Sequence, residues 1–149
     1  MELYHYSNEN FETFDNNLKG TSTDDGVFGE GFYFWDDYNI AELYCNKFGK
    51  YIYIVEIDVS KFYTFDLSET LNSLESLNEI CDCQNLIDYF NENEEIESCE
   101  FLITVIDLTK KLSGLGYTGV KALNREGLDC SEYCVFDSDS ITINEVIEN

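Results

Sequence analysis

Apolar and polar residues alternate at the start of the chain, which is the pattern of a strand. Within residues 1–7, Leu3 and His5 fall on one face and Tyr4 and Tyr6 on the other, because successive strand residues point to opposite sides. The segment that follows is rich in Asn, Asp, Ser, Thr and Gly, which predicts a largely irregular loop.

An aromatic strand that leads into a helix is predicted next. Residues 28–35 have the composition of a strand, and Asp36 and Asp37 suit a helix N-terminus, where carboxylates accept hydrogen bonds from unpaired backbone N–H groups. Gly49 is a typical helix end. Between these limits, apolar residues recur at helical spacing, at Ile40, Ala41, Tyr44 and Phe48.

The middle of the chain changes from strands to helices. Residues 51–59 and 61–65 are predicted strands, because they are rich in β-branched and aromatic side chains. Apolar residues then recur at helical spacing over residues 67–91, in a pattern interrupted near residues 81–83. An amphipathic helix is predicted over residues 101–115, with lysines near its C-terminal end and glycines to stop it.

Three short strands are predicted in the last part of the chain, at residues 117–122, 133–136 and 141–146. Strands at both ends therefore flank a helical insert at about residues 67–115, without a repeat or a domain boundary. This arrangement predicts an α+β fold in a single domain spanning residues 1–149.

Charge is the property that most restricts the partners. The 149 residues include 31 acidic and 8 basic side chains, which leaves a formal net charge of −23. Such a surface repels nucleic acids and anionic membranes, because binding to either depends on Lys and Arg. We therefore expect no direct binding to nucleic acid or membrane. The charge suits a basic protein partner such as nucleic-acid-binding machinery, or it belongs simply to a soluble acidic protein.

Neither a signal peptide nor a membrane span is predicted. Residues 1–14 lack a basic start and an apolar run, and the longest apolar stretch, residues 101–108, is short and contains Asp107. The protein is therefore expected to be soluble, intracellular and cytoplasmic.

The cysteines do not have the spacing of a metal site. Cys81 and Cys83 form a C-x-C pair and Cys130 and Cys134 are four residues apart, but neither is zinc-finger spacing, and the chain has one histidine. Reduced thiols and no bound metal are therefore expected.

Three stretches contain residues that could carry chemistry. They are "LYHYS" at residues 3–7, "FGEGFYF" at residues 28–34 and "SEYCVFD" at residues 131–137. In this order they resemble the three core motifs of the ADP-ribosyltransferase superfamily, in its His-Tyr-Glu class. That class includes the diphtheria-toxin-like and poly(ADP-ribose) polymerase catalytic domains. The resemblance covers roughly the first sixty and the last forty residues.

The motifs assign particular residues to catalysis. The resemblance places the motif histidine at His5, the tyrosine of G-x-G-x-Y-F at Tyr33 and the strand-opening glutamate at Glu132. The helix after the second motif supplies a further tyrosine, Tyr44, as in polymerase-like members. The fold that the resemblance implies has two small, mostly antiparallel sheets that form a cleft for NAD⁺.

The resemblance also implies a role for each residue. Tyr33 and Tyr44 would stack on either face of the nicotinamide ring, and the backbone of Tyr6 would hold its carboxamide. His5 would hydrogen-bond the adenosine-side ribose. Glu132 would hold a hydroxyl of the nicotinamide ribose and stabilise the positive charge of an oxocarbenium-like transition state.

Ser7, Gly31 and Ala41 complete the implied NAD⁺ site. Ser7 and Gly31 are motif residues, whereas Ala41 stands where polymerase-like members have a serine on the carboxamide. Tyr6 replaces the glycine that commonly follows the histidine. Cys130 departs from the paired glutamate of arginine-modifying toxins, which argues against that acceptor class.

The function that the resemblance implies is a mono-ADP-ribosyltransferase, which moves ADP-ribose from NAD⁺ to a protein acceptor without a metal. Residues 115–137, "LGYTGVKALNREGLDCSEYCVFD", are also similar to small bacterial and phage transferases, one phage group of which inhibits CRISPR effectors. The basic target would then be host CRISPR or other defence machinery.

Two other functions stay open. A non-enzymatic acidic decoy, such as a DNA mimic or an antitoxin-like partner, could have the same fold. An NAD⁺ glycohydrolase would share the pocket and use water as the acceptor. For single residues, Tyr33 and Tyr44 could be ordinary core rings, and Glu132 an edge-strand carboxylate.

Overall fold

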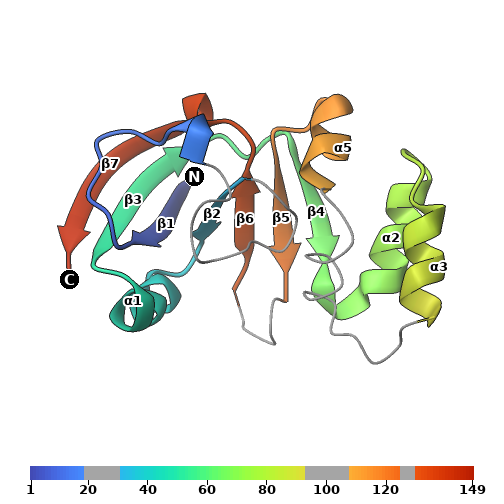
Figure 1. The fold of residues 1–149 in the computed structure, drawn as a ribbon, viewed down its shortest axis with the longest axis horizontal. Helices are drawn as coiled ribbons and strands as arrows, with labels where there is room; N and C mark the ends of the chain where they lie inside the picture. The colour runs from blue at the N-terminus through green and yellow to red at the C-terminus, as the bar shows by residue number, and fades with distance from the viewer. Residues whose placement is uncertain (19–30, 93–107, 125–129) are drawn as a thin grey trace.

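The computed structural model describes residues 1–18, 31–92, 108–124 and 130–149 of the chain. In these ranges the protein is α+β, with one open, mixed sheet of seven strands (Figure 1). The strands are β1 (Glu2–Ser7), β2 (Phe32–Trp35), β3 (Tyr51–Ile57), β4 (Phe62–Asp66), β5 (Gly119–Leu123), β6 (Glu132–Val135) and β7 (Ile141–Glu148). The helices are α1 (Tyr38–Phe48), α2 (Thr70–Asn78), α3 (Gln84–Glu92) and α5 (Leu108–Gly114), with 3₁₀ turns η1 (Asn16–Leu18), η2 (Leu67–Glu69) and η4 (Ser138–Ser140).

The strand order in the sheet is β4–β5–β6–β2–β1–β3–β7, so most neighbours in space are distant in sequence. Only β4 and β5 run parallel, and the other pairings are antiparallel. The expected mostly antiparallel pairing is thus present, but the expected division into two sheets is wrong, because the ladder continues from β1 to β2. That junction is narrow, since a single residue pair, Tyr4 with Trp35, joins the two strands.

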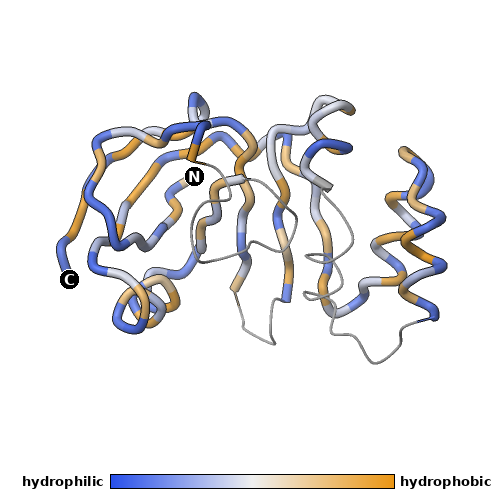
Figure 2. Tube along the Cα trace, in the orientation of Figure 1, coloured by the Kyte–Doolittle hydropathy of each residue, from blue (hydrophilic) through white to orange (hydrophobic). Residues whose placement is uncertain are grey.

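Apolar side chains form two core clusters, one on each face of the sheet. Alternate residues of β6 enter different clusters, because strand side chains alternate between faces: Cys134 belongs to the first cluster, and Tyr133 and Val135 to the second. The first cluster lies between the sheet and α2, α3 and α5. Figure 2 shows apolar and polar residues alternating along α2 and α3, as expected for helices with one buried face.

Helix α1 begins and ends where the sequence predicts. Asp37 is its N-cap, and its Oδ1 accepts a hydrogen bond from Asn39 N at 2.8 Å. Gly49 ends the helix and donates its N–H to Cys45 O at 2.8 Å. Phe48, which the spacing places on the buried face, is 56% exposed instead.

The helical middle is interrupted as predicted. Between α2 and α3, the side chain of Asn78 accepts a hydrogen bond from Cys83 N at 2.8 Å. Helix α5 occupies the second part of the helix predicted near residue 110, whose first part lies outside the described residues. Gly116 follows it with φ 95°, a left-handed conformation that glycine adopts readily. In the described part of the chain, no helix is both long and apolar enough to cross a membrane.

Candidate functional site

The three residues expected to be catalytic lie on three neighbouring strands. His5 is on β1, Tyr33 on β2 and Glu132 at the start of β6, and β2 lies between the other two strands. The register sets Glu132 directly across from Trp35, and Tyr33 across from Cys134. The sheet therefore brings the first and last motifs side by side with the second (Figure 1).

His5 lies where β1 and β2 stop pairing. Its Nδ1 is 2.8 Å from the backbone oxygen of Tyr33. A carbonyl oxygen can only accept, so Nδ1 carries the proton, and the lone pair of a neutral imidazole is then on Nε2. The ring packs against Phe14 and Phe34, with centroids 5.4 and 5.5 Å away. The His5 side chain thus links β1 to β2 in addition to the single backbone pair of Tyr4 with Trp35.

Glu132 is a buried acid, with 1% of its surface exposed. It is paired across the sheet with Trp35 on β2 and Ala122 on β5, and so shares their face. His5 packs with Phe34, which belongs to the cluster on the opposite face. A ligand that contacts both His5 and Glu132 would therefore have to bind where β1 and β2 separate.

The ring of Tyr44 is part of an aromatic stack. It lies parallel to those of Trp35 and Tyr6, with centroids 5.5 and 5.9 Å away and planes inclined by 5° and 12°. Tyr33 packs against the first core cluster. The expectation that Tyr33 and Tyr44 flank a nicotinamide ring stays a prediction, and Trp35 is a further ring that contacts Tyr44. Trp35 could have been predicted from the sequence, because it is two residues from Tyr33 and shares its face of the strand.

The other expected NAD⁺-site residues have structural partners of their own. Ser7 Oγ accepts a hydrogen bond from Glu9 N at 3.1 Å, and Ala41 is buried in α1. Gly31 approaches β6 closely: a Cβ there would overlap Cys134 Sγ and lie 3.1 Å from Val135 O. The close approach of this segment to β6 therefore explains why residue 31 is a glycine. The residues of its motif before Gly31 lie outside the described ranges.

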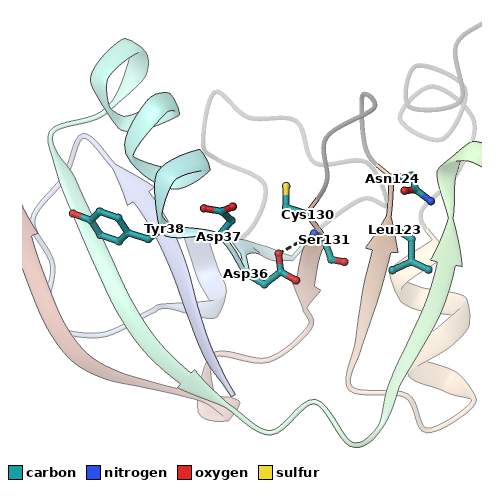
Figure 3. Close-up of a pocket in the computed structure, with 7 residues that line it drawn as sticks. All are labelled: Asp36, Asp37, Tyr38, Leu123, Asn124, Cys130 and Ser131. Carbon is teal, nitrogen blue, oxygen red and sulfur yellow. Dashed lines mark hydrogen bonds between the residues drawn. The ribbon is translucent and has the colours of Figure 1, made fainter.

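A polar pocket of about 560 Å³ opens beside Glu132, and sequence reasoning did not predict it. It lies between the turn from β2 to α1 and the neighbouring ends of β5 and β6 (Figure 3). The residue before Glu132 forms part of its wall, but none of the expected NAD⁺-site residues does. Its lining residues are Asp36, Asp37, Tyr38, Leu123, Asn124, Cys130 and Ser131.

Asp36 connects the two sides of this pocket. Ser131 N donates to Asp36 Oδ1 at 2.8 Å, the bond drawn in Figure 3, and Asp36 N donates to Ser131 O at 3.3 Å. Burial, and then the negative charge of Asp36, raise the pKa of Tyr133 to about 12. Both sequence neighbours of Glu132 therefore interact with Asp36, which restrains the backbone that carries the buried acid.

The residues present suit parts of NAD⁺ to different degrees. Tyr6 and Tyr44, which are half-buried and stack on each other, offer flat aromatic surface of the kind that a nicotinamide ring needs. The pocket beside Glu132 has carboxylates and no Lys or Arg in its described lining, so it does not suit a diphosphate. In the described ranges, no three His, Cys, Asp or Glu side chains are grouped so that they could hold a metal ion.

Comparisons of the chain with protein-family models, curated proteins and solved structures give no match. The features of the molecule that bear on its function are the motif residues and their surroundings, above all Glu132, Tyr44, Trp35 and the pocket beside β6.

Proposed function

We propose that the protein is a mono-ADP-ribosyltransferase, which moves ADP-ribose from NAD⁺ to a protein acceptor. The observation that carries this proposal is the placement of His5, Tyr33 and Glu132 on three adjacent strands, with the Glu132 carboxylate buried. Burying a carboxylate lowers the stability of a fold, which favours a functional role for Glu132. The three-motif resemblance supplies the reaction.

When bound, NAD⁺ supplies a bond between ribose C1′ and nicotinamide that breaks with its electron pair on nicotinamide, while the acceptor loses a proton and bonds to C1′. Glu132 stabilises the positive charge that develops on the ribose in the transition state. Its low exposure strengthens that interaction, because little water screens it.

The other residues bind and orient. Tyr44, with Trp35 packed behind it, presents an aromatic face for the nicotinamide ring, and the backbone of Tyr6 holds the carboxamide. His5 is held through Nδ1 by the Tyr33 carbonyl, and in this tautomer Nε2 is the ring nitrogen that accepts from a hydroxyl of the adenosine-side ribose. Its role is therefore to bind and position, not to move a proton.

The net charge of −23 favours a basic protein as the target. Opposite potentials raise the rate of encounter, and the effect weakens as salt shortens the Debye length, which is about 8–10 Å near physiological ionic strength. Nucleic-acid-binding machinery in a bacterial cytoplasm, including a CRISPR effector if the protein is phage-encoded, has the required charge. The same net charge also favours the second candidate function, a non-enzymatic acidic decoy that binds such a target without modifying it.

Incubation with NAD⁺ and a bacterial lysate tests the proposal, with nicotinamide release measured by chromatography and protein labelling by mass spectrometry. We expect both in the wild type. Glu132→Gln keeps the shape and removes the charge, so turnover should fall on the order of 100-fold while NAD⁺ binding persists. Glu145→Gln makes the same change at an exposed position on β7 and is the matched control.

The outcomes separate the candidate functions. Nicotinamide release without protein labelling would indicate a glycohydrolase. A basic partner bound without any nicotinamide release would indicate the decoy. Equal turnover in wild type and Glu132→Gln would remove Glu132 from the chemistry.

A further inference from the structure

The pocket beside Glu132 has the charge of a cation-binding site. Its described lining contains two carboxylates, Asp36 and Asp37, and no lysine or arginine. Nothing in this described lining neutralises an anionic group such as a phosphate. The volume of about 560 Å³ is also far larger than a single ion needs, so the space suits an extended side chain.

Both carboxylates are held in place by backbone N–H groups. Asp36 Oδ1 accepts from Ser131 N, and Asp37 Oδ1 accepts from Asn39 N, each at 2.8 Å. These bonds fix the orientation of the side chains before any ligand arrives, which lowers the entropy lost on binding. A carboxylate has about four acceptor positions, so both groups keep capacity for further donors.

Ser131 is a second, independent sign of a ligand. The residue is 8% exposed and lines the pocket. Its backbone N and O are both bonded to Asp36, but its hydroxyl makes no hydrogen bond to any residue of the described ranges. This hydroxyl therefore keeps both its donor and its acceptor capacity for a ligand in the pocket. Figure 3 shows this side chain in the wall of the pocket, between Asp36 and Leu123.

We infer that this pocket binds a cationic side chain, arginine or lysine, of the target protein. The inference rests on the proposed function, since it gives the pocket a basic residue of the target protein as its occupant. Ammonium and guanidinium groups carry only donors, which match the carboxylates and the Ser131 hydroxyl.

The same pocket revises what the sequence implies about the acceptor. Cys130, which the resemblance takes as a departure from arginine-modifying toxins, lies in this lining together with Asp36 and Asp37. The negative charge that a second glutamate would provide therefore comes from another segment of the chain, the turn between β2 and α1. A basic acceptor is compatible with this arrangement.

The test uses small probes and the full chain without NAD⁺. Nα-acetyl-arginine methylamide and its lysine analogue carry the charge, and the citrulline analogue has nearly the shape of arginine without it. Each is titrated into ¹⁵N-labelled protein, and the amide shifts of Ser131, Asn39 and Asn124 are followed by NMR. We expect saturable shifts with the arginine probe or the lysine probe, and the two separate titrations show which one binds. The citrulline probe should give no shifts at the same concentration.

Asp37→Asn is the main variant, because asparagine also caps helices and the fold should persist. Its affinity for the cationic probe should be weaker by about threefold or more, in line with an exposed ion pair. Asp58→Asn is the matched control: Asp58 Oδ1 also accepts a backbone N–H two residues on, from Ser60 at 2.9 Å, but lies outside the pocket lining. Ser131→Ala should also weaken binding.

Equal shifts with citrulline, shifts confined to other amides, or equal loss in Asp37→Asn and Asp58→Asn would overturn the inference. NAD⁺ turnover is measured separately on the same samples. Turnover without probe binding at the pocket would reject the cation pocket and leave the transferase. Probe binding without turnover would keep the pocket and reject the transferase.

Discussion

The ring of Tyr44 lies flat against the ring of Trp35, with centroids 5.5 Å apart and planes inclined by 5°. Tyr44 comes from α1 and Trp35 from β2, so the stack fastens the helix to the sheet beside Glu132. Trp35 is the only tryptophan of the chain, which makes its fluorescence a direct report on this contact.

Replacing Tyr44 with alanine should expose Trp35. We expect emission at longer wavelength and a loss of stability that includes about 0.5–1.5 kcal/mol from the aromatic pair itself. Tyr44→Phe keeps the ring and should preserve the emission of the wild type. Fluorescence spectra and urea denaturation measure both effects. The stack would lose its assigned importance if the phenylalanine and alanine variants behaved alike.

The bond between Asp36 and Ser131 gives a second prediction. Asp36→Ala removes the acceptor of the hydrogen bond from Ser131 N. Because this part-buried N–H would then lack a partner, the free energy of unfolding should fall by about 1–3 kcal/mol. Asp36→Asn retains an acceptor oxygen and is the matched variant, so its loss should be clearly smaller. Urea denaturation at neutral pH distinguishes them, and equal losses would mean that charge, not the hydrogen bond, is what matters.

Gly31 provides a prediction about packing. A Cβ at this position would overlap Cys134 Sγ, so Gly31→Ala should destabilise the protein by about 1–3 kcal/mol, as overpacking does. Cys134→Ala removes the overlapping sulfur, and the double variant should recover part of the loss. A double-mutant cycle by denaturation measures this coupling. Strictly additive losses would show that the two side chains do not compete for the same space.

Alkaline pH should destabilise the fold through two buried groups. Burial, and then a hydrogen bond between the Cys83 and Cys81 thiols, raise the pKa of Cys83 from 9.0 to about 12. Burial, and then Asp36, raise the pKa of Tyr133 from 10.0 to about 12. Each raised pKa means that the folded state holds the proton more tightly than the unfolded state does. The stabilisation is therefore complete below about pH 9 and is lost as pH rises towards 12.

Urea denaturation at about pH 8, 9.5 and 11 measures this loss of stability. Cys83→Ala removes one titrating group, so its stability should fall less steeply over this range than that of the wild type. A wild-type stability that stays constant up to the highest pH would contradict the assigned burial of both groups.

Local features of the fold could be predicted from the sequence. Asp37 and Gly49 mark the ends of α1 because capping depends on residues within one turn. The interruption between α2 and α3 was also visible in the spacing of apolar residues. The single sheet was not predictable in the same way, since pairings such as Tyr4 with Trp35 join segments that no local pattern relates.

The site shows the same limit. The register of β2 with β6 explains why Trp35 shares the face of Glu132, but only the position of α1 shows that Tyr44 stacks on Trp35. The pocket was missed because Asp36 and Ser131 are far apart in sequence and meet only through the pairing of β2 with β6.

The narrow junction between β1 and β2 also has a consequence for how the chain folds. On one side of it lie β1, β3 and β7, and on the other lie β2, β6, β5 and β4. In chain order these strands are interleaved, so neither side can assemble from one continuous stretch of polypeptide. Most pairings close long loops, and such topologies fold slowly, in milliseconds to seconds, because loop entropy is lost before the contacts form. We therefore expect β1 to pair only once β3 has formed, and the sheet to form cooperatively rather than strand by strand.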